Sequence, residues 1–308
     1  MDTGRERHHL RPARFAIVVM AVVMLTGCSG AAGIAASGGD GTPSGSSPPI
    51  HLTALPGRLV FDNTHDIWSV NADGTGLRRL THAPWREFDP SWSPDGRLIA
   101  YRAEPHGHPQ VWVMNADGSG QRRLTRDGGF PAWSPDGSMI AYATAGGPFG
   151  RSSIALMTAD GSRRRLVPHT KYGEYPSWSP DGQRIAFNSN VSGQGLMYIV
   201  DLGTSRLVDL SAAGQGHEVA WSPDGRSILF ASDRDHPDNY NDIYEMHPDG
   251  SGVRRLTHVR AEAPAWSPDG RYIAFSAPGG LGVMRADGSG VTFLPITGVG
   301  ETASPDWR

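Results

Sequence analysis

A five-residue motif, Trp-Ser-Pro-Asp-Gly, recurs through most of the chain and limits what it can fold into. The motif begins at Trp92, Trp133, Trp178, Trp221 and Trp266. A shortened sixth copy, Pro305-Asp306-Trp307, follows at a similar spacing. Internal repeats of roughly 40–45 residues with strand-like content are typical of β-propeller blades, in which each unit buries its apolar faces against its neighbours.

Each repeat contains the same four extended segments. The Trp ends the first segment, and Pro-Asp-Gly makes a tight turn because Pro presets φ and Gly accepts a positive φ. In the copy that begins at Trp92, a β-rich run at 97–101 is followed by a third strand at 111–114 and a fourth at 121–125. Asn-Ala-Asp-Gly at 115–118 supplies the hairpin turn between the last two strands. The pattern predicts an all-β protein built of four-stranded antiparallel blades.

The two ends of the repeated region predict how the ring closes. Residues 57–61 correspond to the second strand of a repeat, with no Trp strand before them. The last Trp strand, at 305–307, has no second strand after it. Pairing of these two segments would complete a sixth blade and leave no open edge between blades. We therefore expect a six-bladed β-propeller over residues 51–308, closed by its N- and C-terminal strands.

The motif Trp-Ser-Pro-Asp-Gly-x-x-Ile-Ala-Phe, with the Asp-Gly hairpin that follows it, resembles the WD40-like (PD40) repeat of the TolB-like propellers. The resemblance covers residues 57–308. In that family one propeller face receives partner peptides, so the resemblance implies a protein or peptide partner in the cell envelope. TolB proteins also carry an α/β domain before the propeller, and here we expect a form that lacks it. The same repeat builds propellers in some peptidases and lyases, so the fold alone does not define the function.

The N-terminal residues have the pattern of a secreted lipoprotein. Several Arg precede an apolar run at 15–25, which is shorter than the ~20 residues that a membrane-spanning helix needs. The run ends in Leu-Thr-Gly-Cys, which resembles a bacterial lipobox, the motif whose Cys carries a diacylglycerol. We expect residues 1–27 to be a signal peptide and residues 28–50, rich in Gly, Ala, Ser and Pro, to be a flexible lipidated tether.

This signal predicts where the protein is found. Lipidation at Cys28 would anchor it to the bacterial cell membrane on the extracytoplasmic side, either periplasmic or at the cell surface. Cys28 is also the only cysteine, which excludes an internal disulfide and a cysteine-based zinc site. The formal net charge of −3 argues against a nucleic-acid partner. We expect the protein to be a monomer.

Acidic residues cluster just before the Trp strands. Because the innermost strand of a blade starts near the central channel, these side chains are expected to ring one channel mouth. The candidate partner-binding residues are Glu87, Asp89, Glu174, His217, Glu218, Glu262 and Glu301. A ring of acids would concentrate negative potential and attract a metal ion, an amine or a basic peptide segment. The alternative is that they are solvated loop acids that accept hydrogen bonds from turn N–H groups.

The longest loop between a second and a third strand, residues 233–242, is rich in oxygen ligands. Asp233, Asp235 and Asp238 are the candidate metal ligands, since hard cations such as Ca²⁺ prefer carboxylate oxygens. Calcium could bind in this loop or in the channel. The loop lacks the Gly and the distal Glu of an EF-hand, and the alternative is a polar, turn-rich connection.

Three common catalytic motifs are absent from the sequence. It contains no His-Glu-x-x-His, no Gly-x-Ser-x-Gly and no P-loop. We therefore favour a cell-envelope lipoprotein that acts as a protein- or peptide-binding scaffold through the channel mouth. The alternative is a metal-dependent, lyase-like propeller enzyme that processes a glycan or small molecule. The identity of the partner is not encoded in these motifs.

Overall fold

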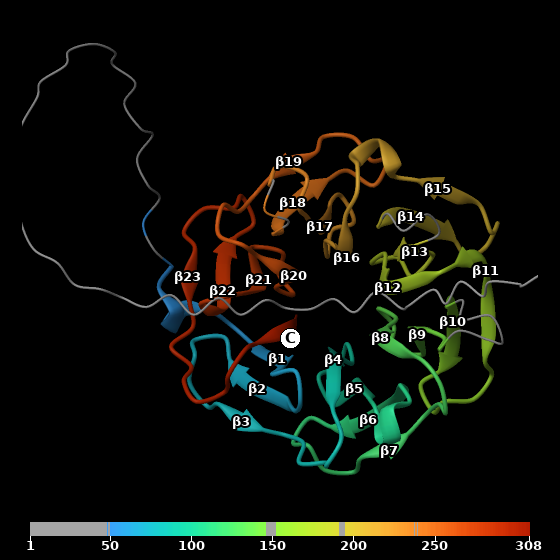
Figure 1. Cartoon of the computed structure of the whole chain (residues 1–308), viewed down its shortest axis with the longest axis horizontal. Helices are drawn as coiled ribbons and strands as arrows, with labels where there is room; N and C mark the ends of the chain where they lie inside the picture. The colour runs from blue at the N-terminus through green and yellow to red at the C-terminus, as the bar shows by residue number, and fades with distance from the viewer. Residues whose placement is uncertain (1–47, 49, 146–151, 191–194, 237, 239) are drawn as a thin grey trace, which may run out of the picture. The chain divides into compact units, whose positions relative to one another are not determined.

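Six four-stranded antiparallel sheets surround a central channel (Figure 1), which confirms the predicted all-β, six-bladed propeller. The computed structural model describes residue 48 and residues 50–145, 152–190, 195–236, 238 and 240–308. The predicted signal peptide and Cys28 lie outside these residues. No helix within the described ranges is long and apolar enough to cross a membrane.

The innermost strand of every blade ends at the Trp of the repeat. The inner strands are β4 (Glu87–Trp92), β8 (Gly129–Trp133), β12 (Gly173–Trp178), β16 (His217–Trp221), β20 (Glu262–Trp266) and β24 (Ala303–Trp307). The second strands are β5 (Leu98–Ala103), β9 (Met139–Ala143), β13 (Arg184–Ser189), β17 (Ile228–Ser232), β21 (Tyr272–Ala277) and β1 (Arg58–Asp62). The repeat period therefore places equivalent residues of each copy at equivalent positions around the channel.

The outer half of each blade is a third strand and a shorter edge strand. The third strands are β6 (Gln110–Asn115), β10 (Ser153–Thr158), β14 (Leu196–Asp201), β18 (Asp242–Met246), β22 (Gly280–Arg285) and β2 (Ile67–Asn71). The edge strands are β7 (Arg122–Arg123), β11 (Arg165–Lys171), β15 (Leu207–Asp209), β19 (Arg254–Arg255), β23 (Thr292–Phe293) and β3 (Arg78–Arg79). Three 3₁₀ turns lie between strands or before them: η1 (Leu52–Ala54), η2 (Pro105–Gly107) and η3 (Ser211–Ala213).

The Ser-Pro-Asp-Gly turn after each Trp is held by its own side chains. In the blade of β4, the Ser93 hydroxyl donates to Asp95 Oδ1 at 2.7 Å, and Arg97 N donates to the same oxygen at 3.1 Å. Gly96 has a φ of +68°, a conformation that favours glycine. The turn residues of the motif therefore fix the sharp reversal between the first and second strands of the blade.

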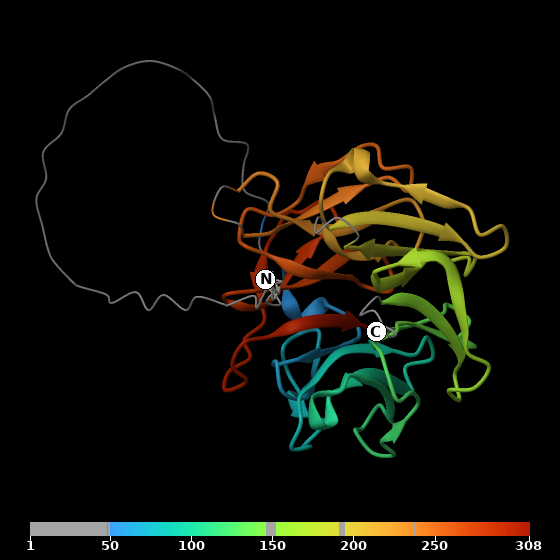
Figure 2. The ribbon, with the colours of Figure 1, turned by 45° about the vertical axis from the view of Figure 1, so that its right-hand side comes forward.

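The ring closes as the sequence predicts, by pairing of β24 with β1. Leu59 lies opposite Trp307 and Val60 opposite Asp306 in an antiparallel register. The Trp307 indole N–H donates to Pro56 O at 3.0 Å. Figure 2 shows β24, in red, beside the blue ribbon with which the propeller begins. The first blade thus takes three strands from one end of the propeller sequence and one from the other.

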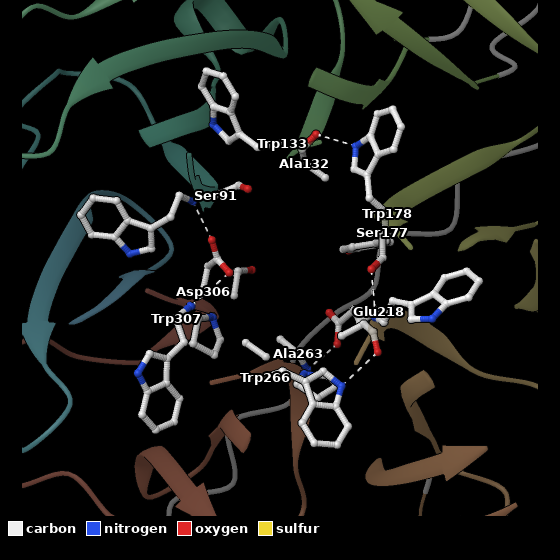
Figure 3. A pocket seen from close by; sticks show the side chains of 18 of the residues that line it. Ser91, Ala132, Trp133, Ser177, Trp178, Glu218, Ala263, Trp266, Asp306 and Trp307 are labelled. Carbon is white, nitrogen blue, oxygen red and sulfur yellow. Dashed lines mark hydrogen bonds between the residues drawn. The ribbon is translucent and has the colours of Figure 1, made fainter. Parts of the chain in front are cut away.

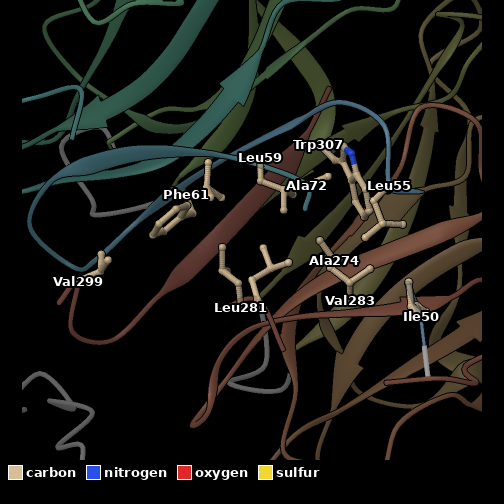
Figure 4. Close-up of a cluster of buried hydrophobic side chains, with 12 residues drawn as sticks. Ile50, Leu55, Leu59, Phe61, Ala72, Ala274, Leu281, Val283, Val299 and Trp307 are labelled. Atoms are coloured by element: carbon tan, nitrogen blue, oxygen red, sulfur yellow. The ribbon is translucent and has the colours of Figure 1, made fainter. Parts of the chain in front are cut away.

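The hydrophobic core is divided into clusters that lie between neighbouring blades. The cluster at the closure joins strands of the first and last blades with the segment that precedes β1 (Figure 4). In it, Ile50 and Leu55 pack with Leu59, Leu281 and Trp307. Because these residues come from distant parts of the sequence, their burial holds the two ends of the ring together as well as adding apolar contact area.

Candidate functional site

The central channel contains a cavity of about 380 Å³ that is lined by all six inner strands. We call the end of the channel where these strands begin the upper mouth. In Figure 3 the labelled indoles point away from the centre of the cavity, while Glu218 lies at its edge beside Ala263. The indoles therefore extend from the cavity toward the packing between blades, although the Trp residues also form part of its lining.

A β-bulge interrupts every inner strand at the same place. The register with the second strand shifts there in each blade. The residue three positions before the Trp has a positive φ, between 45° and 55°, at Asp89, Phe130, Tyr175, Glu218, Ala263 and Ser304. Such a conformation is uncommon for non-glycine residues, and a bulge re-aims the side chain it carries. All six residues line the cavity, and we call them the mouth ring.

Neighbouring members of the mouth ring contact one another around the opening. The Ser304 hydroxyl donates to Asp89 Oδ1 at 3.2 Å. The rings of Phe130 and Tyr175 lie with their centroids 4.1 Å apart. Glu218 Oε2 accepts a hydrogen bond from the backbone N–H of Ala263 at 2.7 Å. These contacts join three pairs of adjacent blades across the ring.

Asp89 is a half-buried acid of the ring. Burial, and after it the charge of the nearby Asp62, raise the pKa of Asp89 to about 7. Its Oδ2 is buried and has no hydrogen-bond partner among the described residues. The nearest cation is Arg102, whose guanidinium lies 3.8 Å from Oδ2. That guanidinium also pairs with Glu104, so the positive charge of Arg102 is shared between two carboxylates.

A third acid lies directly behind the ring. Asp62, at the end of β1, is 1% exposed. Its two oxygens accept hydrogen bonds from Thr64 N at 3.0 Å and from Asp89 N at 3.2 Å. Burial raises the pKa of Asp62, and the charge of Glu218 raises it further. The two acids of the ring and Asp62 therefore interact electrostatically at the upper mouth.

Of the seven predicted binding residues, the structure brings two into the mouth ring, Asp89 and Glu218. Glu174 lies one residue before a ring member, in a separate cavity of about 250 Å³ that it shares with Arg102. Burial raises the pKa of Glu174, and the charge of Arg102 opposes this. Glu174 therefore extends the polar rim next to the opening without lining it.

Glu87 is turned away from the channel although it is on the same strand as Asp89. It is 1% exposed, and its backbone N–H donates to His65 O at 2.9 Å. Burial raises the pKa of Glu87 to about 7, and its Oε2 is buried with no hydrogen-bond partner among the described residues. Glu87 is therefore buried between the first and second blades.

The other three predicted residues lie outside the mouth ring. His217 Nδ1 is 3.5 Å from Glu218 Oε2. Burial acts to lower the pKa of His217, but the hydrogen bond and charge of Glu218 outweigh it and raise the pKa to about 9. Glu262 is exposed and accepts a hydrogen bond from the Asn241 side chain at 2.8 Å. Glu301 is exposed in the segment that leads into β24.

The three predicted calcium ligands do not form a group. Asp235 accepts a hydrogen bond from the Tyr244 hydroxyl at 2.6 Å, and Asp238 is exposed. Asp233 is half-buried. Within the described residues, no three His, Cys, Asp or Glu side chains are grouped so that they could hold a metal ion.

Sequence reasoning missed four members of the ring: Phe130, Tyr175, Ala263 and Ser304. None of the four carries a charge, whereas the predicted binding residues were acids and one His. The signal that would have found them is position, because each stands three residues before a repeated Trp. The same offset picks out Asp89 and Glu218 and leaves out Glu87, Glu174, Glu262 and Glu301.

Comparison with known proteins agrees with this architecture. The family model PD40, described as the TolB beta propeller domain, matches residues 53–177 and 129–307. A Tol-Pal system protein TolB from Nitratidesulfovibrio vulgaris is 44% identical over 39 residues, which are 13% of this chain and 9% of that protein. A protein TolB homolog from Chlorobium luteolum is 40% identical over 53 residues, 17% of this chain and 12% of that protein. The matched segments thus span about a tenth of those relatives.

Solved structures show the same fold. A crystal structure of TolB from Acinetobacter baumannii aligns with a TM-score of 0.72 and 21% identity, covering 84% of this chain and 68% of that chain. A putative TolB from Agrobacterium tumefaciens aligns with a TM-score of 0.64 and 23% identity, covering 78% of this chain and 89% of that chain. At these identities the likeness concerns the fold.

Proposed function

The chain belongs to the TolB β-propeller family, and from that premise we propose that it is a cell-envelope lipoprotein that binds a protein or peptide over its upper mouth. The TolB-like fold is in general that of a protein-binding scaffold. The observation that carries the proposal is the mouth ring. Six side chains from six blades are re-aimed by bulges toward one cavity.

The composition of the ring supports recognition of a partner. It combines two acids with an adjacent pair of aromatic rings, and aromatic side chains are often the residues that contribute most to protein interfaces. The contacts between ring members across blade boundaries restrict their side chains before a partner binds, which lowers the conformational entropy that binding would cost. Glu174 and Arg102 add a polar rim beside it. A loop or tail of a partner that enters the opening would meet apolar and charged surface together.

The location in the envelope rests on the N-terminal sequence and on the family. The lipobox-like sequence that ends at Cys28 supports export and lipidation. The names of the relatives assign those proteins to the Tol-Pal system or to TolB. For this chain we propose the envelope location and a protein partner, without assigning the system.

Capture of the partner tests the binding proposal. The tagged full-length lipoprotein is recovered from detergent-solubilised envelopes and its companions are identified by mass spectrometry. The Asp89→Asn, Glu218→Gln double variant runs in parallel, with Glu301→Gln as a matched control for loss of an acid outside the ring. A stoichiometric partner that is kept by wild type and control and lost by the double variant supports the proposal. Equal recovery by the double variant would refute a role for the mouth ring.

Replacement of Cys28 tests the anchor. Cys28→Ser removes the thiol that would carry the diacylglycerol, so we expect the protein to move from the membrane fraction to the soluble extracytoplasmic fraction. Intact mass should show the lipid on the wild type alone. A Cys28→Ser protein that stays in the membrane fraction would contradict lipid anchoring at this residue.

A further inference from the structure

The two acids of the mouth ring lie on opposite sides of the channel. Around the ring, each blade contributes one residue, in the order Ser304, Asp89, Phe130, Tyr175, Glu218 and Ala263. Asp89 and Glu218 are therefore three blades apart, which is half of the circle. Their charges still interact, because the charge of Glu218 helps to raise the pKa of Asp89. The space between these two residues, which we call the slot, therefore has one carboxylate on each side.

The two walls between the acids differ in size and chemistry. One wall is the aromatic pair Phe130 and Tyr175, whose rings are in contact. The other wall is Ala263 and Ser304, two of the smallest side chains. The Arg102 guanidinium lies over the Phe130 ring, 5.2 Å from its centroid, so this aromatic pair already has a cation on one of its two rings. Aromatic faces attract cations, and most strongly planar or poorly hydrated ones.

At and beside the upper mouth, carboxylates outnumber cationic side chains. Asp62, Asp89, Glu104, Glu174, Glu218 and Glu262 are the acids at or beside the mouth. Asp306 is a further acid, because it lines the same cavity. Three cationic groups face these acids: Arg102, His217 and Arg308. Arg102 pairs with Glu104 and His217 with Glu218, while Asp89 Oδ2 is left without a hydrogen bond among the described residues. A donor that enters the slot would satisfy this buried oxygen.

From this slot we infer that the upper mouth recognises one basic side chain of the partner, an arginine or lysine that lies between Asp89 and Glu218 and against Phe130 and Tyr175. The inference rests on the proposed function and specifies the chemistry of its partner. A peptide cation fits better than a metal ion because the described residues offer no group of three metal ligands. The wall between the acids is aromatic, whereas calcium requires a shell of oxygens.

A displayed library of random peptides tests this preference directly. The library is selected on the full-length lipoprotein in detergent and, separately, on the Asp89→Asn, Glu218→Gln variant. Both substitutions keep the size and shape of the side chain, and Asn tolerates the positive φ at position 89. We therefore expect the variant to fold, and its melting temperature is measured as the control. We expect peptides selected on the wild type to share an arginine or lysine. We expect no such enrichment on the variant.

One selected peptide is then synthesised with its basic residue and with neutral citrulline or norleucine in its place. Loss of the charge should weaken binding by about tenfold, the size of one charge-assisted hydrogen bond. Asp89→Asn and Glu218→Gln should each weaken it similarly, Tyr175→Ala and Phe130→Ala by about threefold to tenfold, and Glu301→Gln should not change it. Free argininamide should compete at far higher concentration than the peptide, and EDTA should have no effect.

Several results would overturn the inference. Selected peptides without a basic residue would do so, as would equal binding of the charged and neutral peptides. Binding that needs Ca²⁺ and is abolished by EDTA would assign the slot to a metal ion. Failure of the inference is distinguishable from failure of the proposed function. If a captured partner needs the mouth ring but binds equally well after its own basic residues are neutralised, the proposed function is supported and only the recognition of a basic side chain is refuted.

Discussion

Closure of the ring by β24 can be tested at Trp307. This side chain is 4% exposed and packs with Leu55, Leu59 and Leu281. Its indole N–H donates to Pro56 O at 3.0 Å. Trp307→Ala would remove this packing and one buried hydrogen bond. Removal of a buried Trp costs about 3–5 kcal/mol, and a hydrogen bond adds about 1 kcal/mol.

A loss of about 4–6 kcal/mol should lower the melting temperature of a domain of this size by roughly 10–20 °C. The matched control is Trp266→Ala. Trp266 also donates a hydrogen bond from its indole, to Ala220 O at 3.3 Å. Its strand, β20, is connected to β21 by a Ser-Pro-Asp-Gly turn, whereas β24 is held to β1 without such a connection. Trp307→Ala should therefore loosen the closure as well as the core.

The two variants are compared by thermal melting and by hydrogen exchange of the full-length protein. Beyond any difference in melting, we expect amides of β1 to exchange faster in Trp307→Ala under conditions where Trp266→Ala leaves them protected. Local opening at the closure is the physical reason. Protection of β1 that is the same in both variants would refute the argument that β24 closes the ring, and so would a wild-type melting temperature in Trp307→Ala.

Three further changes have expected outcomes. Burial raises the pKa of Glu87 from 4.5 to about 7, so the free energy of unfolding falls as pH rises through that range and the buried carboxyl becomes charged. Glu87→Gln should therefore match wild type in melting temperature near pH 4 and exceed it at pH 8. The pKa of His217 is raised from 6.5 to about 9, so its contribution to the free energy of unfolding is fully present below pH 6.5 and is lost as pH rises through 9. Glu218→Gln should flatten this pH dependence when melting temperatures are measured across that range. An unchanged pH dependence would contradict the pairing of His217 with Glu218. Gly282→Ala would place a methyl group against the Phe275 ring, and should lower the unfolding free energy by about 1–3 kcal/mol in denaturant titration; unchanged stability would show that the ring moves freely.

The fold was largely predictable because it is repeated. Each Trp-Ser-Pro-Asp-Gly copy carries its own turn chemistry, and the observed turns use it as expected, with Asp95 capping the turn and Gly96 at positive φ. The missing strand at one end and the extra strand at the other predicted the pairing of β1 with β24. Local rules sufficed here because the same short-range pattern is satisfied in every blade.

The site was predictable only in part. The acids before the Trp strands were expected to form one ring, and Asp89 and Glu218 do line the channel. Glu87 is two residues from Asp89 on the same strand, yet it is buried between blades. Glu262 is next to a ring position but points to Asn241. Proximity to the Trp in sequence therefore identified the correct strand ends without identifying which side chains enter the channel.

The sequence by itself determined the number of blades, the strand order and the closure, because a repeat that cannot bury its apolar faces alone must stack on its neighbours. Only the tertiary structure decided the chemistry of the mouth. A bulge in each inner strand shifts the register and turns one residue per blade inward. It also sets residues about forty-five positions apart, such as Phe130 and Tyr175, in direct contact. Those contacts depend on how the six blades meet around the axis, which no single repeat specifies.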